Sequence, residues 1–573
     1  MKVSDFIAKF FEINGITHCF ELSGGMIAHL LDSFSRTKIQ IVSMHHEQSA
    51  GFAAEGYARL KGLPGLAMAT SGPGATNLLT AIGSCYFDSI PCLFITGQVN
   101  RHEMKGDRPI RQLGFQETDI LSMAKPVVKR AVQVREVDQL KGILKDCWEL
   151  ACEGRPGPVL IDIPMDIQRL DIAGDPELMI GIEVSEPFSH KDDLFLGFFH
   201  EMMSALESSK RPLLLLGGGS VLNSDLETFV ENLGIPVVTT LLGKDRIASC
   251  HKLWSGFIGS YGNRWANRAL ENCDVLVVLG SRLDIRQTGA NLEPFSSKKV
   301  FHIDVDLGEI NSRLSGCKGL QMKSQLFTKL CLAQGCLIDN ALFKEWKERI
   351  ECEKSEFSDL LELKGLDINP NNLMRLISQK VKKDHVGYTV DVGSHQMWAA
   401  QSIRIKQNER WFTSGGMGAM GFSLPCAIGM CFAANKQTVT CILGDGCFQI
   451  NSQDLNTLKA HNLPIKVLLI NNSSLGMITQ FQDSYFASNY QSTINGYSHP
   501  DFVAVSKAYG IDARLLKSSE QTSDLINWLY EDDSPKLLEV RIPKNTKTYP
   551  KIAFGRSVGF MEPDFNPTEI EST

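Results

Sequence analysis

The chain has 573 residues, enough for several domains, because a single domain typically holds about 100 to 150 residues. Its composition, 43% hydrophobic and 21% charged, is that of an ordinary globular protein. The net charge of −7 argues against a nucleic-acid partner, and no run approaches the roughly 18 apolar residues that span a bilayer, so no membrane partner is expected.

The N-terminus and the cysteines predict a cytoplasmic protein. Residues 1–11 carry Asp5 and Lys9 inside an apolar stretch, which favours an amphipathic helix over a signal peptide. The 15 cysteines are scattered and form no C-x-x-C pair. Several lie in apolar runs, so we interpret them as reduced thiols of the core.

Short apolar runs alternate with helical periods along the chain. They are bounded by Gly or Pro, as expected for strands buried in parallel sheets. The expected strands are residues 66–70, 92–96, 159–163, 212–216, 275–279, 300–305, 438–443, 465–470 and 536–542. This alternation predicts an α/β fold built from doubly wound units.

Two breaks divide the chain. Residues 171–190 are polar, with Gly, Pro and acidic residues, and are interpreted as a linker. Residues 335–372 form a charged helical region between two strand-rich blocks. We therefore expect three doubly wound parallel-sheet domains, at 1–170, 190–335 and 365–545, followed by a C-terminal tail at 546–573.

Glu47 follows an expected strand at 39–43 and begins an expected amphipathic helix. A lone Glu at this position is usually a solvated charge that favours the helix dipole. Its neighbours are small and apolar, however, which indicates a buried carboxylate that needs a partner. Residues 70–77 form a Gly- and Pro-rich turn from strand to helix, which is common in α/β proteins.

Several strand ends of the central block, together with Arg155 of the first block, carry residues that suit a dinucleotide-type ligand, since a doubly wound sheet binds its ligand at such ends. A lone glycine turn is weak evidence for such a site. The residues concerned are Arg155, Gly217, Gly218, Gly219, Thr240, Leu241, Gly280, Arg282, Asp284, Arg286 and Asp304. An empty or vestigial pocket is the alternative.

The expected strands 438–443 and 465–470 end at Gly444-Asp445-Gly446 and at Asn471-Asn472, with a helix expected between them at 452–460. Parallel strand ends place this carboxylate and carboxamide side by side. Such hard oxygen ligands suit Mg²⁺, which usually completes its octahedron with phosphates. The flanking glycines let a diphosphate approach the backbone. The pattern predicts a metal–diphosphate site.

Six motifs occur together and in one order: His46-Glu47-Gln48, and those at residues 71–77, 115–118, 154–158, 414–421 and 444–472. On these motifs the chain resembles the acetolactate synthase (acetohydroxyacid synthase) large-subunit family of thiamine-diphosphate enzymes, over about residues 1–545. The resemblance implies an N-terminal pyrimidine-binding domain, a central FAD-type domain and a C-terminal diphosphate- and Mg²⁺-binding domain. It also implies a homodimer or homotetramer, because Glu47 faces the diphosphate domain of another chain in such enzymes.

The resemblance also implies roles for single residues. Glu47 matches the glutamate that hydrogen-bonds the pyrimidine ring and promotes acid/base work through the cofactor. Met420 matches the bulky residue that enforces the cofactor's bent shape, although a plain core methionine is the alternative. The other implied contacts are Gly25 and Gln116 near the reacting carbonyl, the Gly418 carbonyl at the 4′-amino group, Gly444 and Gly446 at the diphosphate, and Asp445, Asn472 and the Ser474 carbonyl on Mg²⁺. A structural FAD is implied for the central-domain residues named above.

The implied reaction is decarboxylation of pyruvate and transfer of the hydroxyethyl unit to a second carbonyl. A second pyruvate, giving 2-acetolactate, is the primary expectation. Arg286 matches the arginine that pairs with the acceptor's carboxylate, although it could contact FAD alone.

Three departures from the family pattern indicate a reshaped, less cationic acceptor site: Phe481 stands for Trp, Met165 for Lys, and Ser394 for Gln. Ser23 also stands where the family usually has Pro before its glycine loop. The main alternative is therefore transfer to a keto-sugar nucleotide for branched-chain sugar synthesis. An FAD-dependent pyruvate oxidase is a further alternative.

Overall fold

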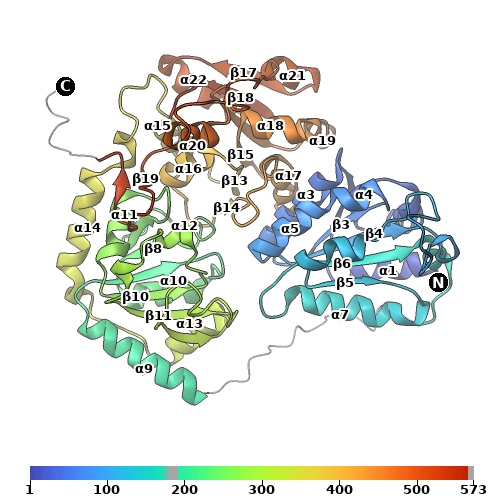
Figure 1. The fold of residues 1–573 in the computed structure, drawn as a ribbon, viewed down its shortest axis with the longest axis horizontal. Helices are drawn as coiled ribbons and strands as arrows, with labels where there is room; N and C mark the ends of the chain where they lie inside the picture. The colour runs from blue at the N-terminus through green and yellow to red at the C-terminus, as the bar shows by residue number, and fades with distance from the viewer. Residues whose placement is uncertain (175, 177–191, 565–573) are drawn as a thin grey trace.

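The computed structural model describes residues 1–174, 176 and 192–564. Three six-stranded sheets, all parallel, follow one another along the chain, with helices packed on their faces (Figure 1). This confirms the predicted α/β class of three doubly wound domains. The predicted linker at 171–190 lies largely outside the described residues, as does the end of the predicted tail. None of the described helices has the length and apolar character needed to cross a membrane.

The first sheet has the strand order β2-β1-β3-β4-β6-β5. Its strands are β1 His18–Leu22, β2 Gln40–Ser43, β3 Gly65–Ala69, β4 Cys92–Gln98, β5 Arg130–Gln133 and β6 Val159–Pro164. Its helices are α1 Val3–Ile13, α2 Ala28–Phe34, α3 Glu47–Lys61, α4 Pro73–Asn77, α5 Leu79–Asp88, α6 Ile120–Ala124, α7 Leu140–Cys152 and α8 Met165–Arg169. The central strands β3, β4 and β6 are buried over their full length, as expected for runs of Val, Ile, Leu and Ala covered on both faces.

The central sheet has the order β12-β11-β10-β7-β8-β9. Its strands are β7 Pro212–Leu216, β8 Val237–Thr239, β9 Trp254–Phe257, β10 Val275–Leu279, β11 Lys299–Asp304 and β12 Lys318–Gln321. Its helices are α9 Asp192–Ser208, α10 Ser224–Leu233, α11 Arg264–Asn272, α12 Ile285–Thr288, α13 Ser324–Ala333 and α14 Lys344–Glu356. From β7 the chain first adds β8 and β9 on one side and then returns to add β10, β11 and β12 on the other. In such a sheet a crevice forms between the two central strands, β7 and β10, at their carboxyl ends.

The third sheet has the order β14-β13-β15-β16-β18-β17, which repeats the order of the first sheet. Its strands are β13 Gly387–Val390, β14 Arg410–Phe412, β15 Val439–Gly444, β16 Ile465–Asn471, β17 Asp512–Leu516 and β18 Lys536–Arg541. Its helices are α15 Pro370–Lys380, α16 Ser394–Ser402, α17 Ser423–Ala433, α18 Asp445–Asn451, α19 Leu455–His461, α20 Gly476–Tyr485, α21 Phe502–Ala508 and α22 Thr522–Leu529.

The helix expected at 452–460 differs from the structure. A helix, α18, begins at Asp445 itself, directly after β15, and a short 3-10 turn at Ser452–Asp454 separates it from α19. The glycines around Asp445 masked this start in the sequence. The carboxylate is favoured there, because the N-terminus of a helix attracts negative charge.

Helix α3 was expected to be amphipathic, but its residues are buried from Ser49 to Ala58. The helix lies between its own sheet and α17 of the third domain, as Figure 1 shows. The two helices approach through glycines. A Cβ on Gly56 would lie 2.2 Å from the Cys426 carbonyl oxygen, and one on Gly429 only 1.8 Å from that of Ala53. The first and third domains therefore share a closely packed interface.

The C-terminal segment returns from the third domain to the central one (Figure 1). The Thr548 N–H donates to Gln480 Oε1 at 2.8 Å, and the Ile552 N–H donates to the Ser260 carbonyl at 2.8 Å. A small antiparallel pair, β19 Lys551–Ile552 and β20 Met561–Glu562, follows. Val558 is fully buried against the central core. The described part of the tail thus joins two domains.

Candidate functional site

The strand pair β15 and β16 places Asp445 and Asn472 at one edge of the third sheet. Gly444, the last residue of β15, pairs with Ile470, so Asp445 and Asn472 both lie just beyond this register. Asp445 is 3% exposed, and its Oδ2 has no hydrogen-bond partner among the described residues. Burial raises the pKa of this carboxyl to about 6. A buried oxygen without a donor is the kind of group that a cation satisfies.

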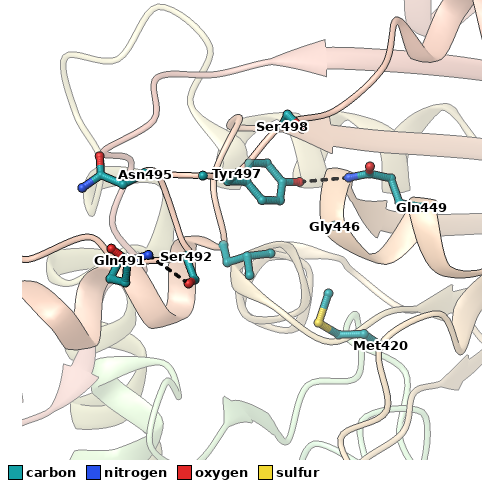
Figure 2. A pocket seen from close by; sticks show the side chains of 10 residues that line it. Met420, Gly446, Gln449, Gln491, Ser492, Asn495, Tyr497 and Ser498 are labelled. Carbon is teal, nitrogen blue, oxygen red and sulfur yellow. Dashed lines mark hydrogen bonds between the residues drawn. The ribbon is translucent and has the colours of Figure 1, made fainter.

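A pocket of about 430 Å³ lies beside Gly446 (Figure 2). Figure 2 shows Tyr497 reaching across it, with Gln449 donating to the Tyr497 hydroxyl at 3.3 Å. Any side chain at Gly446 would enter this space, since a Cβ would lie 2.7 Å from Leu475 Cδ2 and 3.1 Å from Met420 Cε. The lining residues are Met420, Gly446, Gln449, Leu475, Gln491, Ser492, Asn495, Gly496, Tyr497 and Ser498. All of them belong to the third domain.

Asn472 and Ser474 follow β16 and are buried. The Ser474 hydroxyl donates to the Lys544 carbonyl at 3.2 Å. Ser394, at the start of α16, is close by: a Cβ on Gly476 would lie 2.7 Å from Asn472 Nδ2 and 2.9 Å from Ser394 Oγ. The Ser394 hydroxyl is buried without a hydrogen-bond partner among the described residues, so it is free to meet a ligand.

Glu47 lies in the first domain, at the N-terminus of α3, and is 7% exposed. Asn77 Nδ2 donates to Glu47 Oε2 at 2.9 Å. A Cβ on Gly74 would lie 3.2 Å from Glu47 Oε1, so the glycine turn at 70–77 packs directly on the carboxylate. This turn is therefore a wall of the Glu47 site.

The same turn gathers Gly25 and Gln116. The neighbouring Gly24 packs on Thr70, where a Cβ would lie 2.5 Å away, whereas a Cβ on Gly25 would meet open space. Gln116 has a positive φ of 67° and packs against Gly72. Glu47, Gly25 and Gln116 thus surround one turn of the first domain, apart from the pocket beside Gly446.

The remaining predicted residues of the third domain lie at its surface. Gly418 is exposed, with a φ of 65° that favours glycine. Phe481 on α20 is 52% exposed and does not line the pocket beside Gly446. Its ring packs against Tyr485 and Phe486, with centroids 4.6 and 5.9 Å away.

A second cavity, of about 570 Å³, opens at the carboxyl ends of the central strands. It collects most of the residues that the sequence singled out for a dinucleotide-type ligand: Arg155, Gly218, Gly219, Thr240, Leu241, Gly280, Arg282, Asp284, Arg286 and Asp304. Gly217 is not among the lining residues, and a Cβ there would lie 2.1 Å from the Gly280 carbonyl oxygen, so the strand ends approach each other closely at this glycine. Residues of the first and third domains complete the wall, so the cavity lies where the three domains meet.

Charged groups of both signs surround this cavity. Arg155 donates to Asp306 at 3.1 Å and to Glu309 at 2.6 Å. Burial raises the pKa of Asp304, whose Oδ1 accepts the Asp306 N–H at 2.9 Å. Arg286 is exposed and lines this cavity but not the pocket beside Gly446. Its pairing with an acceptor stays a prediction.

Sequence reasoning missed several residues around the loop that carries Met420. The buried Asp391 accepts the N–H groups of Gly421 at 3.0 Å and Ser423 at 2.8 Å. His395 is buried against Gly444, and burial lowers its pKa to about 3. Tyr497 closes one side of the pocket. Asp391 and His395 follow an apolar strand, which was a usable signal, whereas Tyr497 lies in an irregular segment that offered none.

The fold and these two sites define a class of protein. Three thiamine pyrophosphate enzyme models match the chain: the N-terminal TPP binding domain at residues 1–123, the central domain at 199–325 and the C-terminal TPP binding domain at 391–540. The chain is thus a thiamine-diphosphate enzyme, and its first and third domains are the cofactor-binding ones.

Relatives narrow this class. The chain is 34% identical to acetolactate synthase 2, chloroplastic, of Nicotiana tabacum, over 97% of this chain and 84% of the relative. It is 32% identical to the acetolactate synthase large subunit of Porphyra purpurea, over 96% of this chain and 94% of the relative. The chain belongs to the acetolactate synthase large-subunit family, and it is a thiamine-diphosphate-dependent carboligase.

Proposed function

We propose that the enzyme decarboxylates pyruvate and joins the two-carbon unit to a second pyruvate, giving 2-acetolactate. The observation that carries this proposal is the match along nearly the whole chain to relatives named acetolactate synthases. Two pyruvates and one proton give one 2-acetolactate and one CO₂, so the reaction needs no oxidant or reductant.

We also propose Mg²⁺ as the cation at Asp445 and Asn472, with the Ser474 carbonyl as a third ligand. The Asp445 oxygen without a donor supports this. Within the described ranges, no three His, Cys, Asp or Glu side chains gather to hold a metal. A cation here therefore depends on further oxygens, which a diphosphate supplies, and this is the usual way that Mg²⁺ is held.

Thiamine diphosphate, when bound, supplies the electron sink that decarboxylation needs. The chain contributes charge, shape and proton handling. Glu47 is buried enough to hold a proton at a nitrogen of the pyrimidine ring, and the Asn77 amide fixes the orientation of its carboxylate. Met420 lines the wall beside Gly446, where its bulk would exclude water and would support a bound cofactor.

For the central cavity we propose FAD in a structural role. The cavity offers glycine turns that let a ligand approach the backbone, the predicted arginines Arg155, Arg282 and Arg286 for its phosphates, and a buried Asp304 for a hydroxyl. A carboligation does not change the oxidation state of a flavin, so none of the catalytic steps depends on it.

A second candidate acceptor is a keto-sugar nucleotide. The observation that favours it is the aromatic cluster of Phe481, Tyr485, Phe486 and Phe554, whose members are all exposed. Such a face suits stacking on a nucleobase better than recognition of the small pyruvate molecule.

The test is product identification by NMR. The full-length enzyme with thiamine diphosphate, Mg²⁺ and FAD is incubated with pyruvate alone, then with pyruvate and a keto-sugar nucleotide. Rapid formation of 2-acetolactate from pyruvate alone is expected. Slow formation of 2-acetolactate, together with a fast branched-sugar product, would refute the primary proposal. Anaerobic bleaching of the flavin by pyruvate would instead indicate an oxidase.

A further inference from the structure

The loop that carries Met420, residues 414–421 and here called the cofactor loop, is held by a side chain of the first domain. Asp88, at the end of α5, accepts the Gly415 N–H on Oδ2 at 2.9 Å and the Gly416 N–H on Oδ1 at 2.7 Å. The Asp88 side chain has no exposed surface. Two charge-assisted bonds to successive peptides fix both the position and the direction of the loop.

A buried arginine completes this contact. Arg59 of α3 donates to Asp88 Oδ2 at 2.8 Å and to Glu55 Oε1 at 2.5 Å. Burial by itself lowers the pKa of Arg59, but the two carboxylates outweigh it and raise the pKa, so the guanidinium stays charged. The central carbon of the Arg59 guanidinium, Cζ, lies 5.7 Å from the ring centroid of Phe412 and 5.6 Å from that of Phe422.

The position of these rings matters, because Phe412 and Phe422 flank the cofactor loop in the chain. Phe412 ends β14, and Phe422 immediately precedes α17. Arg59 therefore sits between the two ends of the loop while Asp88 holds its first glycines. Near the same end, the Ser84 and Ser414 hydroxyls lie 3.3 Å apart. The first domain thus holds the cofactor loop of its own chain from several sides.

The same residues also form part of the central cavity. Arg59, Asp88 and Gly415 line it, beside the strand ends of the central domain. A molecule that fills the cavity would touch Gly415 of the cofactor loop and Arg59, which donates to the buried Asp88 carboxylate, and it would restrict their motion. The two cofactor sites are therefore joined by a continuous set of packed, hydrogen-bonded groups.

We propose that Asp88 is a positioning residue that fixes the cofactor loop and couples this loop to occupancy of the central cavity. The coupling rests on the proposed flavin site, whereas the positioning role rests on the Asp88 contacts alone. Coupling is reciprocal, so FAD tightens thiamine diphosphate by the same factor as thiamine diphosphate tightens FAD.

The positioning role is tested with Asp88→Asn and Gly416→Ala. In Asp88→Asn, an amide NH₂ group replaces one of the two carboxylate oxygens, so it faces a backbone N–H of Gly415 or Gly416 that then has no acceptor. In Gly416→Ala, the new Cβ would lie 2.5 Å from Phe87 Cβ and 3.1 Å from Asp88 Oδ1. Thiamine-diphosphate affinity is measured by calorimetry with excess Mg²⁺. We expect about tenfold weaker binding in both variants, equal to about 1.4 kcal/mol.

Matched controls are Asp146→Asn, at an exposed ion pair with Arg130, and Gly142→Ala, where a Cβ meets open space. They should bind as the unaltered enzyme does. At saturating thiamine diphosphate, kcat should change less than the KM for the cofactor, a split that general unfolding does not produce. Because Gly416 is exposed, Gly416→Ala remains informative if Asp88→Asn does not fold. Unchanged affinity in folded Gly416→Ala would overturn the positioning role.

The coupling is tested by repeating the titrations on flavin-free and FAD-loaded protein. FAD should tighten thiamine diphosphate at least about fivefold in the unaltered enzyme, and this factor should fall toward one in Gly416→Ala. Equal affinities with and without FAD would refute the coupling. A protein that retains no flavin absorbance after gel filtration would refute the flavin site and the coupling together, while the Asp88 role is still judged on thiamine-diphosphate affinity.

Discussion

Two buried carboxylates, Glu47 and Asp445, have different partners, and this difference suits them to different chemistry. Glu47 receives a hydrogen bond from Asn77, so its orientation is fixed within its own domain. Asp445 keeps one buried oxygen without a donor among the described residues. The first arrangement suits a group that exchanges a proton with a ligand, and the second suits a group that binds a cation.

Replacing Glu47 with Gln should remove proton handling but keep the volume and polarity of the site. We expect kcat to fall by roughly 10² to 10⁴, the usual contribution of a general acid or base. Thiamine-diphosphate affinity, measured by calorimetry, should change far less. Glu149→Gln, at a partly exposed position on α7, is the matched control. Intact activity in Glu47→Gln would contradict the assigned role.

His395 should make the protein sensitive to acid. Burial lowers its pKa from about 6.5 to about 3, so this contribution to stability is fully present above pH 6.5 and is lost as the pH falls toward 3. At pH 5 the loss should be roughly 2 kcal/mol. In His395→Gln, the drop in the midpoint of thermal unfolding between pH 7 and pH 5 should be smaller. The control His102→Gln, at an exposed position, should behave like the unaltered protein. If the drop in His395→Gln is as large as in the unaltered protein, protonation of His395 is not the cause of the acid sensitivity.

At the scale of elements, the turn from β15 to α18 forms the edge at which we propose that the metal and diphosphate bind. The strands beside this turn were predictable, since β15 and β16 are continuous apolar runs. The placement of Asp445 and Asn472 at the neighbouring ends of these strands was predictable for the same reason. The start of α18 was not, because glycine weakens the helical signal around Asp445. The burial of α3 on all sides also escaped sequence reasoning, since its second covering layer, α17, comes from another domain.

Gly446→Ala tests this turn. A Cβ on residue 446 would lie 2.7 Å from Leu475 Cδ2 and 3.1 Å from Met420 Cε, closer than ordinary van der Waals contact. The substitution should therefore narrow the pocket without changing its charge. We expect at least about tenfold weaker thiamine-diphosphate binding, or about 1.4 kcal/mol, measured by calorimetry. Gly142→Ala in α7 is the matched control. Equal affinity would show that the cofactor lies elsewhere.

At the scale of the molecule, the residues proposed for catalysis fall into two groups, which we treat as half-sites. Glu47, Gly25 and Gln116 surround one turn in the first domain, and the pocket beside Gly446 has no lining residue from that domain. Phe115, next to Gln116, is 80% exposed, and Ile110 and Leu113 close to it in the chain are exposed as well, so this segment presents apolar surface of the kind found at interfaces. We propose that a second copy of the chain covers this face and unites the half-sites in a homodimer.

A mixing experiment tests this arrangement. Glu47→Gln and Asp445→Ala are each expected to be inactive. In a dimer with shared sites, a mixed dimer of the two has one site with both residues intact, so a randomised equal mixture should regain about a quarter of the unaltered activity. Glu47→Gln mixed with itself is the control. No recovery, in mixtures where mass spectrometry shows mixed dimers, would place each site within one chain.

The sequence by itself determined the parallel strands, the sheet edge where Asp445 and Asn472 lie and the family, because periodicity, glycine turns and short motifs are local properties of the chain. Only the tertiary structure decided which groups meet across domains. Arg59 enters between Phe412 and Phe422, and Asp88 holds Gly415, across more than three hundred residues of chain. No local pattern specifies such pairs, because they form only when separately wound domains pack together and exclude water.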